Sequence, residues 1–452
     1  MPALEKALKH SQKIGIDECE ITSVKKKIIT VRITDSEIAE IKENFGKDYG
    51  IRLIHKKKIA SVQTTDEKEI EKSIDIGLRS LTNLKSREFW GGLPYETHHR
   101  ILNGTFDKEL EQISGSKVID IAQNMINSSN NNKVNTITGS LNIVSEDFEL
   151  RNSRGLHYEE KATYISGIIN AESEHGEIPV SGIGHDCERT LASFDTEKIG
   201  NDAKIMCIES INPQKIDSEI YSVIFEPYSV GELLAFVVAH NFNFKTFSEK
   251  KSCFSNDFQE VIAVKEFTMV DDPHVSEGMG TKSTDDEGVE TSKINLVEKG
   301  IFKNTLSNLF DSYKEGSKST GNGLRIGSPL GRSSEPIPVS APHNIKINSG
   351  SSSQEDMIKN TTHGLLVGRL WYTYAINPIK GDFSCTARSG IRIIENGEIK
   401  GSGKSVRIIH NLPIMLKNIS EIGNNPRNVI QWASLPSITP SIKVENIAVK
   451  SI

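Results

Sequence analysis

The chain has 452 residues, a formal net charge of -6 and 36% hydrophobic residues. Its length exceeds one typical hydrophobic core and predicts about two or three domains, and its apolar content excludes global disorder. Acidic and basic residues are interspersed, so no broad positive field is available for a phosphate backbone, and nucleic acid is not an expected partner.

The five cysteines are scattered along the chain without a close pair. This spacing argues against a disulfide framework and favours a reducing compartment. The first residues are polar and lack the apolar core of a signal peptide, and no stretch reaches the roughly 18 apolar residues of a membrane span. We therefore expect a cytoplasmic protein with no membrane contact.

The first predicted elements are a helix and an antiparallel meander. Residues 3–13 place apolar side chains on one side and lysines on the other, which is typical of a short amphipathic helix. The β-branched runs 28–34 and 51–54 predict strands. The lysine triplets 25–27 and 56–58 are interpreted as solvated turns between those strands.

Further helices and strands follow in the first half. Apolar residues recur at near-helical spacing in 66–84 and 107–127, which predicts two helices. Segments 148–153 and 162–169 are strand-like, and 186–212 carries another helical pattern. Together these segments predict an α+β arrangement.

Residues 213–215, Pro-Gln-Lys, mark the predicted domain boundary. We expect an N-terminal α+β domain, residues 1–215, built on an antiparallel sheet with helices. The remainder, residues 216–452, consists mostly of short β-branched runs joined by Gly, Asn and Pro turns, which predicts a β-rich antiparallel C-terminal domain. Its predicted elements are a strand at 221–225, a helix ending near His240, and helices at 353–361 and 411–421.

Residues 235–240, Ala-Phe-Val-Val-Ala-His, are the best candidate for a metal site. In zinc hydrolases a helix commonly carries histidines that hold the ion and a glutamate that handles the proton of the attacking water. Ala235 and Phe236 stand where a ligand and the acid would be required, and neither side chain can bind metal or move a proton. We therefore interpret His240 as structural and expect no metal bound by this chain.

Asp285, Asp286 and Glu287 place three carboxylates side by side in the sequence. Such a group can bind a hard cation or serve as acid and base. The spacing of an EF-hand is absent, so an acidic turn is the plainer interpretation.

Two further motifs carry residues of chemical interest. Residues 401–405, Gly-Ser-Gly-Lys-Ser, resemble the end of a phosphate-binding loop, but Glu398 replaces its first glycine and a predicted strand follows where a helix is required. Cys385 lies near Arg388, and a neighbouring cation favours a thiolate nucleophile. His343, His363 and His410 lie in the same half, but the sequence places none of them beside Cys385.

Taken in order, several segments resemble the TldD/PmbA family, known as microcin-processing peptidases and described as modulators of DNA gyrase. The weaker N-terminal segments are Tyr49–Ile54, Ser61–Asp66 and Asn152–Gly155. The more specific C-terminal segments are Asp285–Gly288, Val297–Lys303, Thr320–Asn322, Asn377–Ser384 and Ile394–Ile399. The resemblance spans nearly the whole chain.

The resemblance implies a two-domain protein that works as a dimer. One branch of the family carries a His-Glu-x-x-x-His helix and a late cysteine that hold zinc, and the other branch lacks them and pairs with the first. Here Ala235 and Phe236 replace the first histidine and the glutamate, and residues 430–433, Ile-Gln-Trp-Ala, stand where the cysteine would fall. The Gly381-Asp382-Phe383-Ser384 motif also resembles the metal-free PmbA/TldE-like branch, although the continuation Cys385–Arg388 departs from its usual glycine-containing turn.

The resemblance therefore implies a non-catalytic subunit that joins a TldD-like zinc subunit in a complex degrading small or unfolded peptides. As chamber or interface features we select His240, Asp285, Asp286, Glu287, Gly381, Asp382 and Ser384. Two alternatives stay open. One is a stand-alone homodimeric binding or assembly protein, and the other is a cysteine-dependent hydrolase using Cys385.

Overall fold

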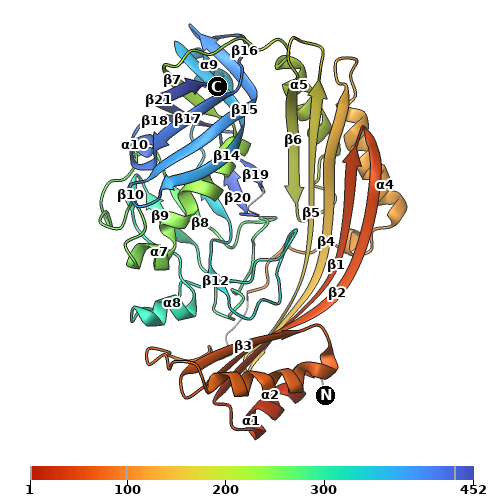
Figure 1. Cartoon of the computed structure of the whole chain (residues 1–452), viewed down its shortest axis with the longest axis vertical. Coiled ribbons are helices and arrows are strands. Elements are labelled where there is room, and N and C mark those ends of the chain that lie inside the picture. The colour runs from red at the N-terminus through yellow and green to blue at the C-terminus, as the bar shows by residue number, and fades with distance from the viewer. Residues whose placement is uncertain (1–2, 97–99, 432–433) are drawn as a thin grey trace.

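The computed structural model describes residues 3–96, 100–431 and 434–452. A long twisted sheet from the N-terminal half stands beside a C-terminal part made of two smaller sheets (Figure 1). Within the described residues, no helix is long and apolar enough to cross a membrane. This arrangement is the predicted α+β architecture, with an antiparallel N-terminal sheet carrying helices and a β-rich C-terminal part.

The N-terminal sheet has the strand order β3-β2-β1-β4-β5-β6, and all its neighbours are antiparallel. Its strands are β1 (Glu18–Thr34), β2 (Glu37–His55), β3 (Lys58–Thr64), β4 (Thr136–Asn152), β5 (His157–Ser173) and β6 (Val180–Glu188). Its helices are α1 (Ala3–Lys13), α2 (Ile70–Leu81), α3 (Lys108–Glu111), α4 (Gly115–Ser129) and α5 (Thr196–Glu209). Helices α1 and α2 cover one end of the sheet, and α4 and α5 cover the other (Figure 1).

Three details of the N-terminal half differ from the sequence prediction. Residues 180–188 form strand β6 because they pair with β5, so the helical pattern at 186–212 is realised only in α5, which Asp195 caps. The helix expected at 107–127 is interrupted, because Ser114 caps a new helix. The lysine triplet 25–27 lies inside β1, where Lys26 Nζ donates to Leu330 O at 2.8 Å instead of facing solvent.

The first C-terminal sheet closes on itself. Its strand order is β14-β7-β21-β17-β15-β16, and an additional pairing of β14 with β15 completes a ring, while β18 pairs with β21. Most pairings are antiparallel, but β7 and β14 are parallel. The strands are β7 (Ile220–Phe225), β14 (His363–Asn377), β15 (Asp382–Glu395), β16 (Glu398–Ser402), β17 (Val406–Asn411), β18 (Ile419–Ile422) and β21 (Ile442–Ser451).

The second C-terminal sheet has the order β10-β9-β8-β13-β20-β19. Its strands are β8 (Met269–Asp271), β9 (Ile294–Glu298), β10 (Ile301–Phe302), β13 (Ile345–Ile347), β19 (Arg427–Val429) and β20 (Ser437–Thr439), and a separate two-stranded pair joins β11 (Gly323–Leu324) to β12 (Val339–Ser340). The C-terminal helices are α6 (Pro227–Leu233), α7 (Phe244–Ser248), α8 (Leu309–Lys314), α9 (Gln354–Lys359) and α10 (Leu412–Lys417). The helix expected at 411–421 ends early, because residues 419–422 pair with β21.

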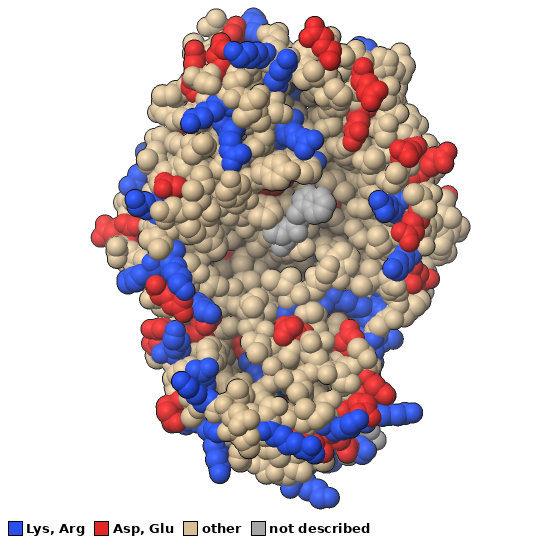
Figure 2. All heavy atoms as spheres, in the orientation of Figure 1, with Lys and Arg blue, Asp and Glu red and all other residues tan. Residues whose placement is uncertain are grey.

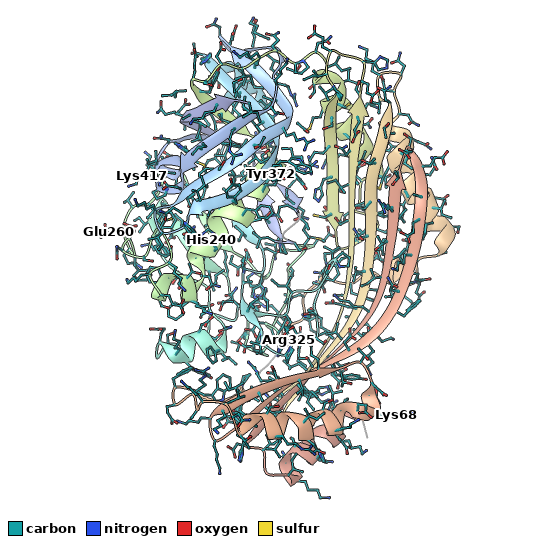
Figure 3. All side chains as sticks on the ribbon, viewed as in Figure 1. Lys68, His240, Glu260, Arg325, Tyr372 and Lys417 are labelled. Atoms are coloured by element: carbon teal, nitrogen blue, oxygen red, sulfur yellow. The ribbon has the colours of Figure 1, made fainter. Side chains whose placement is uncertain are left out.

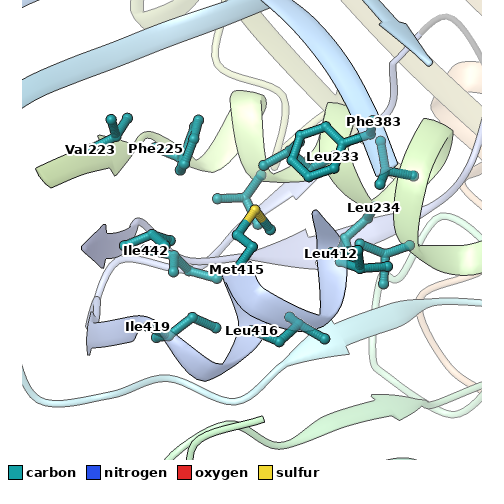
Figure 4. Close-up of a cluster of buried hydrophobic side chains, with 14 of the residues drawn as sticks. Val223, Phe225, Leu233, Leu234, Phe383, Leu412, Met415, Leu416, Ile419 and Ile442 are labelled. Atoms are coloured by element: carbon teal, nitrogen blue, oxygen red, sulfur yellow. The ribbon is translucent and has the colours of Figure 1, made fainter. Parts of the chain in front are cut away.

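One hydrophobic core joins both C-terminal sheets. Figure 4 shows part of it, where Leu233 and Leu234 from the α6 region meet Phe383 of β15 and Leu412 and Met415 of α10. Strand β17 follows residues 401–405 directly, so the predicted strand stands where a phosphate-binding loop requires a helix.

Candidate functional site

The segment that carries His240 is a helix that changes its winding. Helix α6 begins at Pro227, a favourable first helical residue, and continues as a π-helical turn over Leu234–Val238 and a 3-10 turn over Ala239–Phe242. Short π-helical turns inside helices occur frequently at functional sites. Leu234, Val237 and Val238 are buried, so this segment is fixed against the C-terminal core.

His240 stands at the end of this segment and lies in the middle of Figure 3. Its side chain is half-buried, and its Nε2 has no hydrogen-bond partner in the described part of the chain. Burial lowers the pKa of His240, so the imidazole is neutral at pH 7. This nitrogen is also shielded from solvent, so a ligand in the open solvent does not reach it.

A groove of about 640 Å³ runs beside His240. Its walls include Phe310, the exposed apolar residue Val339 of β12, and the charged residues Lys245 and Asp311. Strand β12 pairs with β11, and on its other side Ser340 O accepts from Asn243 Nδ2 at 2.6 Å and Pro338 O accepts from Asn308 Nδ2 at 3.1 Å. The groove therefore offers apolar side chains, and not a free strand edge, to a ligand.

The donor set around His240 does not fit zinc. Ala235 and Phe236 carry no metal-binding atom, and within residues 3–96, 100–431 and 434–452 no group of three possible ligands includes His240. The one group found there is Glu149, His157 and Glu159, at the far end of β4 and β5. Arg151 Nε donates to Glu149 at 2.6 Å, so a positively charged side chain already pairs with one carboxylate of this group.

The late segment reaches the same helix. Gln431 is buried, and its Nε2 donates to Gly231 O of α6 at 2.8 Å. The structure therefore brings residues 430 and 431 beside the helix, as the family resemblance implies. Trp432 and Ala433, which stand near the expected cysteine position, lie outside the described residues.

The acidic turn predicted at 285–287 is buried. Asp285, Asp286 and Glu287 are each 0% exposed. Burial and the neighbouring Glu287 raise the pKa of Asp285 well above its ordinary value, whereas Lys282 and Arg332 outweigh burial and lower the pKa of Asp286. Two adjacent carboxyls thus have pKa values shifted in opposite directions, and neither reaches solvent.

This turn is held by arginines that also contact the N-terminal sheet. Arg332 donates to Asp286 at 2.8 Å and to Glu146 of β4 at 3.0 Å. Arg52 of β2 donates to Glu287 at 2.7 Å. Because buried charges are tolerated only when they are paired, these bonds fix the two halves of the chain in one orientation. These bonds make a buried ionic network between the two halves, which we call the ionic joint.

The Gly381–Ser384 motif forms the start of β15. Gly381 has φ +81°, a conformation that glycine adopts freely, and Asp382 accepts from Asn411 Nδ2 at 2.9 Å. Ser384 is fully buried, and in the described residues its Oγ has no partner. None of these side chains lines the groove beside His240.

Cys385 is poorly placed for nucleophilic chemistry. Its side chain is 0% exposed, and burial raises the pKa of its thiol far above the ordinary value. No hydrogen bond from Cys385 to a histidine is found in the described part of the chain. The structure therefore opposes the cysteine-dependent hydrolase.

Sequence reasoning missed a second polar cluster, which surrounds Glu232 of α6. Glu232 is 3% exposed, and its Oε2 accepts from Leu370 N at 2.7 Å. Arg369 of β14 is also buried, and its guanidinium lies 4.6 Å from the ring centre of Trp371. The sequence signal for this cluster was a single charged residue inside each of two apolar runs, 230–234 and 365–370.

The model of the PmbA/TldA metallopeptidase C-terminal domain matches residues 218–451, which is more than half of the chain. The chain belongs to the PmbA/TldD family. It is 24% identical over 398 residues to an uncharacterized protein of Methanocaldococcus jannaschii, covering 88% of this chain and 89% of that protein. It is 28% identical over 260 residues to the metalloprotease PmbA of Escherichia coli O157:H7, covering 57% of this chain and 53% of that protein.

Solved structures share the fold over the whole chain. TldE from Thermococcus kodakarensis superposes with a TM-score of 0.90 at 24% identity and 100% coverage of both chains. A putative modulator of DNA gyrase from Thermotoga maritima superposes with a TM-score of 0.87 at 22% identity and 99% coverage of both chains. At these identities the structural likeness shows the fold.

Proposed function

We propose that this chain is a PmbA/TldE-like subunit of a metallopeptidase complex that degrades small or unfolded peptides. In this proposal a zinc-bearing TldD-like partner carries out catalysis, and this chain closes the chamber and holds peptide. Membership of a metallopeptidase family and the TldE-type fold support the proposal. Five free cysteines agree with the cytoplasmic location that we propose for the complex.

The observation that carries this proposal is the donor set of the α6 segment. The only imidazole of the segment 234–242 belongs to His240, and positions 235 and 236 hold an alanine and a phenylalanine. A zinc peptidase needs at least three protein ligands and a group that accepts a proton from water. Among the described residues around His240 neither requirement is met, and we therefore assign catalysis to a partner.

The groove beside His240 supplies the peptide-binding role. Its apolar walls include Ile337 and Val339, which are 54% and 50% exposed. Apolar walls accept the apolar side chains of many peptides. A folded protein buries most of its apolar side chains, whereas a small or unfolded peptide exposes them, which agrees with small or unfolded substrates.

Metal analysis and co-purification test the proposal. The chain purified alone should hold no stoichiometric zinc, and the complex with a zinc-bearing relative should hold zinc and cleave an unstructured peptide until a chelator is added. His240→Ala should leave the zinc content of the complex unchanged. Stoichiometric zinc in the isolated chain would contradict the proposal.

The second candidate function is a homodimeric binding or assembly protein without peptidase activity. It shares the fold and the groove but needs no zinc-bearing partner. Purification from native extract separates the two candidates. Recovery of this chain only with itself, without a relative that carries a His-Glu-x-x-x-His helix, would favour the homodimer.

A further inference from the structure

Strand β14 departs from regular pairing after Arg369. Its register with β15 shifts between Arg369 and Leu370 and again between Trp371 and Tyr374. Within the second irregularity Tyr372 has φ +46°, in the left-handed region, which is an outlier for a bulky aromatic residue. Bulges and strained residues of this kind are common next to binding sites, where they redirect side chains.

This bulge points an aromatic ring outward. The Tyr372 side chain is 68% exposed. Figure 3 places Tyr372 above His240, on the side of the C-terminal part nearer the N-terminal sheet. The face seen in Figure 2 is hollowed at its centre, and charges of both signs are interspersed over the rest of it.

Two guanidinium groups lie against the indole of Trp371. The Cζ atoms of Arg369 and Arg388 are 4.6 and 4.8 Å from its ring centre. Arg369 is only 5% exposed, yet in the described part of the chain neither arginine has a carboxylate within salt-bridge distance. Arg369 Nε and Trp371 Nε1 are buried, and they too have no partner among those residues.

Glu232, the acidic residue near Arg369, does not neutralise the charge of Arg369 at pH 7. Glu232 approaches from α6, but its carboxyl accepts from the backbone of β14 and not from the guanidinium. Burial raises the pKa of Glu232 to about 8, so this carboxyl is mostly protonated at neutral pH. Burial likewise raises the pKa of Tyr228, which stays neutral. Arg369 and Arg388 therefore both lie against one indole without a carboxylate in salt-bridge distance among the described residues.

We propose that Arg369, Trp371 and Arg388 form a binding site for a carboxylate, and that its natural occupant is the C-terminal carboxylate of a short peptide. A buried, unpaired guanidinium is costly unless an anion completes it, and arginine matches the two oxygens of a carboxylate. The exposed ring of Tyr372 beside the site offers an apolar surface to the last side chain of the peptide. The proposal rests on the peptide-binding role proposed above.

Titration of the purified chain with N-acetyl-trialanine and with its C-terminal amide tests the site. Tryptophan fluorescence reports binding, because the guanidinium groups lie on Trp371, and Trp371→Phe identifies its share of the signal. The free acid should bind at least about tenfold more tightly than the amide, since a charge-assisted hydrogen bond is lost in the amide. Equal affinity of the acid and the amide would overturn the proposal.

Matched variants locate the binding site. Arg388→Gln changes an exposed residue and spares the fold, so it should weaken binding of the free acid at least about tenfold, and Arg369→Gln should do the same. Arg407→Gln is the control, because Arg407 lies on the neighbouring strand and donates to Tyr374 Oη at 2.6 Å. An unchanged affinity of Arg388→Gln would overturn the proposal even if Arg369→Gln failed to fold.

Two further measurements distinguish a peptide carboxylate from other occupants of the site. Competition by inorganic phosphate at a lower concentration than acetate would assign the site to phosphate and overturn the peptide occupant. Loss of the dimer in Arg388→Gln, without any carboxylate binding to the wild type, would assign the face to a subunit contact and overturn the proposal as well. Failure of these titrations leaves zinc analysis and co-purification unaffected, so it is distinguishable from failure of the proposed function.

Discussion

The sharpest prediction concerns Glu232, because its substitution by glutamine is nearly isosteric. In Glu232→Gln the new amide oxygen can still accept from Leu370 N, which now donates to Glu232 Oε2 at 2.7 Å. The charged and titratable groups that face it are Tyr228 of α6, Arg369 of β14 and Cys385 of β15. The substitution therefore removes one titration and keeps the packing.

The magnitude follows from the pKa of Glu232. Burial raises it from 4.5 to about 8 in the folded chain, so between these pH values the folded state holds a proton that the unfolded state releases. The free energy of unfolding of the wild type must then fall as pH rises from about 4.5 to 8. At about 1.36 kcal/mol per pH unit the loss is on the order of 5 kcal/mol, which Glu232→Gln abolishes.

Urea unfolding at pH 5, 7 and 8.5, followed by far-UV circular dichroism, measures the effect. The variant should gain stability relative to the wild type as pH rises, by on the order of 3–5 kcal/mol across the series. Glu355→Gln on α9 is the control, because Glu355 is exposed. A difference between Glu232→Gln and the wild type that stays constant with pH would refute the assignment of a buried, protonated carboxyl.

Three other substitutions or treatments have definite expected results. Arg332→Met should lower the free energy of unfolding in urea by about 3–5 kcal/mol, because its buried carboxylate partners lose their cation. The control Lys25→Met breaks an exposed pair and should lower it by under about 1 kcal/mol. Equal losses in the two variants would contradict the ionic joint. Cys385 should resist iodoacetamide in the folded chain and react after unfolding, and fast labelling of the folded chain would show an accessible thiol. Gly184→Ala should destabilise by about 1–3 kcal/mol, since its Cβ would overlap the backbone oxygen of Ile199; an unchanged melting temperature would exclude that clash.

Local pattern was sufficient for the elements that bury one face. The helix predicted at 3–13 is α1, and the one at 66–84 contains α2, because apolar residues at helical spacing must pack on the sheet. The strands predicted at 28–34 and 51–54 are confirmed as parts of β1 and β2, which extend well beyond them through the predicted turn at 25–27. Pattern failed at 180–188, where pairing with β5 decides the conformation.

The candidate site likewise has one part that the sequence predicts and another part that only the tertiary structure decides. The absence of a donor at positions 235 and 236 is readable from the sequence, because it depends only on side-chain chemistry. Whether a titratable side chain is solvated is a tertiary property. The sequence predicts an acidic turn at Asp286, but its burial at 0% exposure depends on Arg332, which lies far along the chain, and on the nearby Lys282, which both pair with it.

The sequence by itself determined the α+β class, the family resemblance and the chemistry missing around His240, since these depend on residue types in order. Only the tertiary structure decided which charges are paired. Arg369 and Glu232 lie far apart along the chain, and the parallel pairing of β14 with β7 brings them together next to Trp371. Electrostatic interactions depend on distance and burial in space, and neither quantity can be read from spacing along the chain.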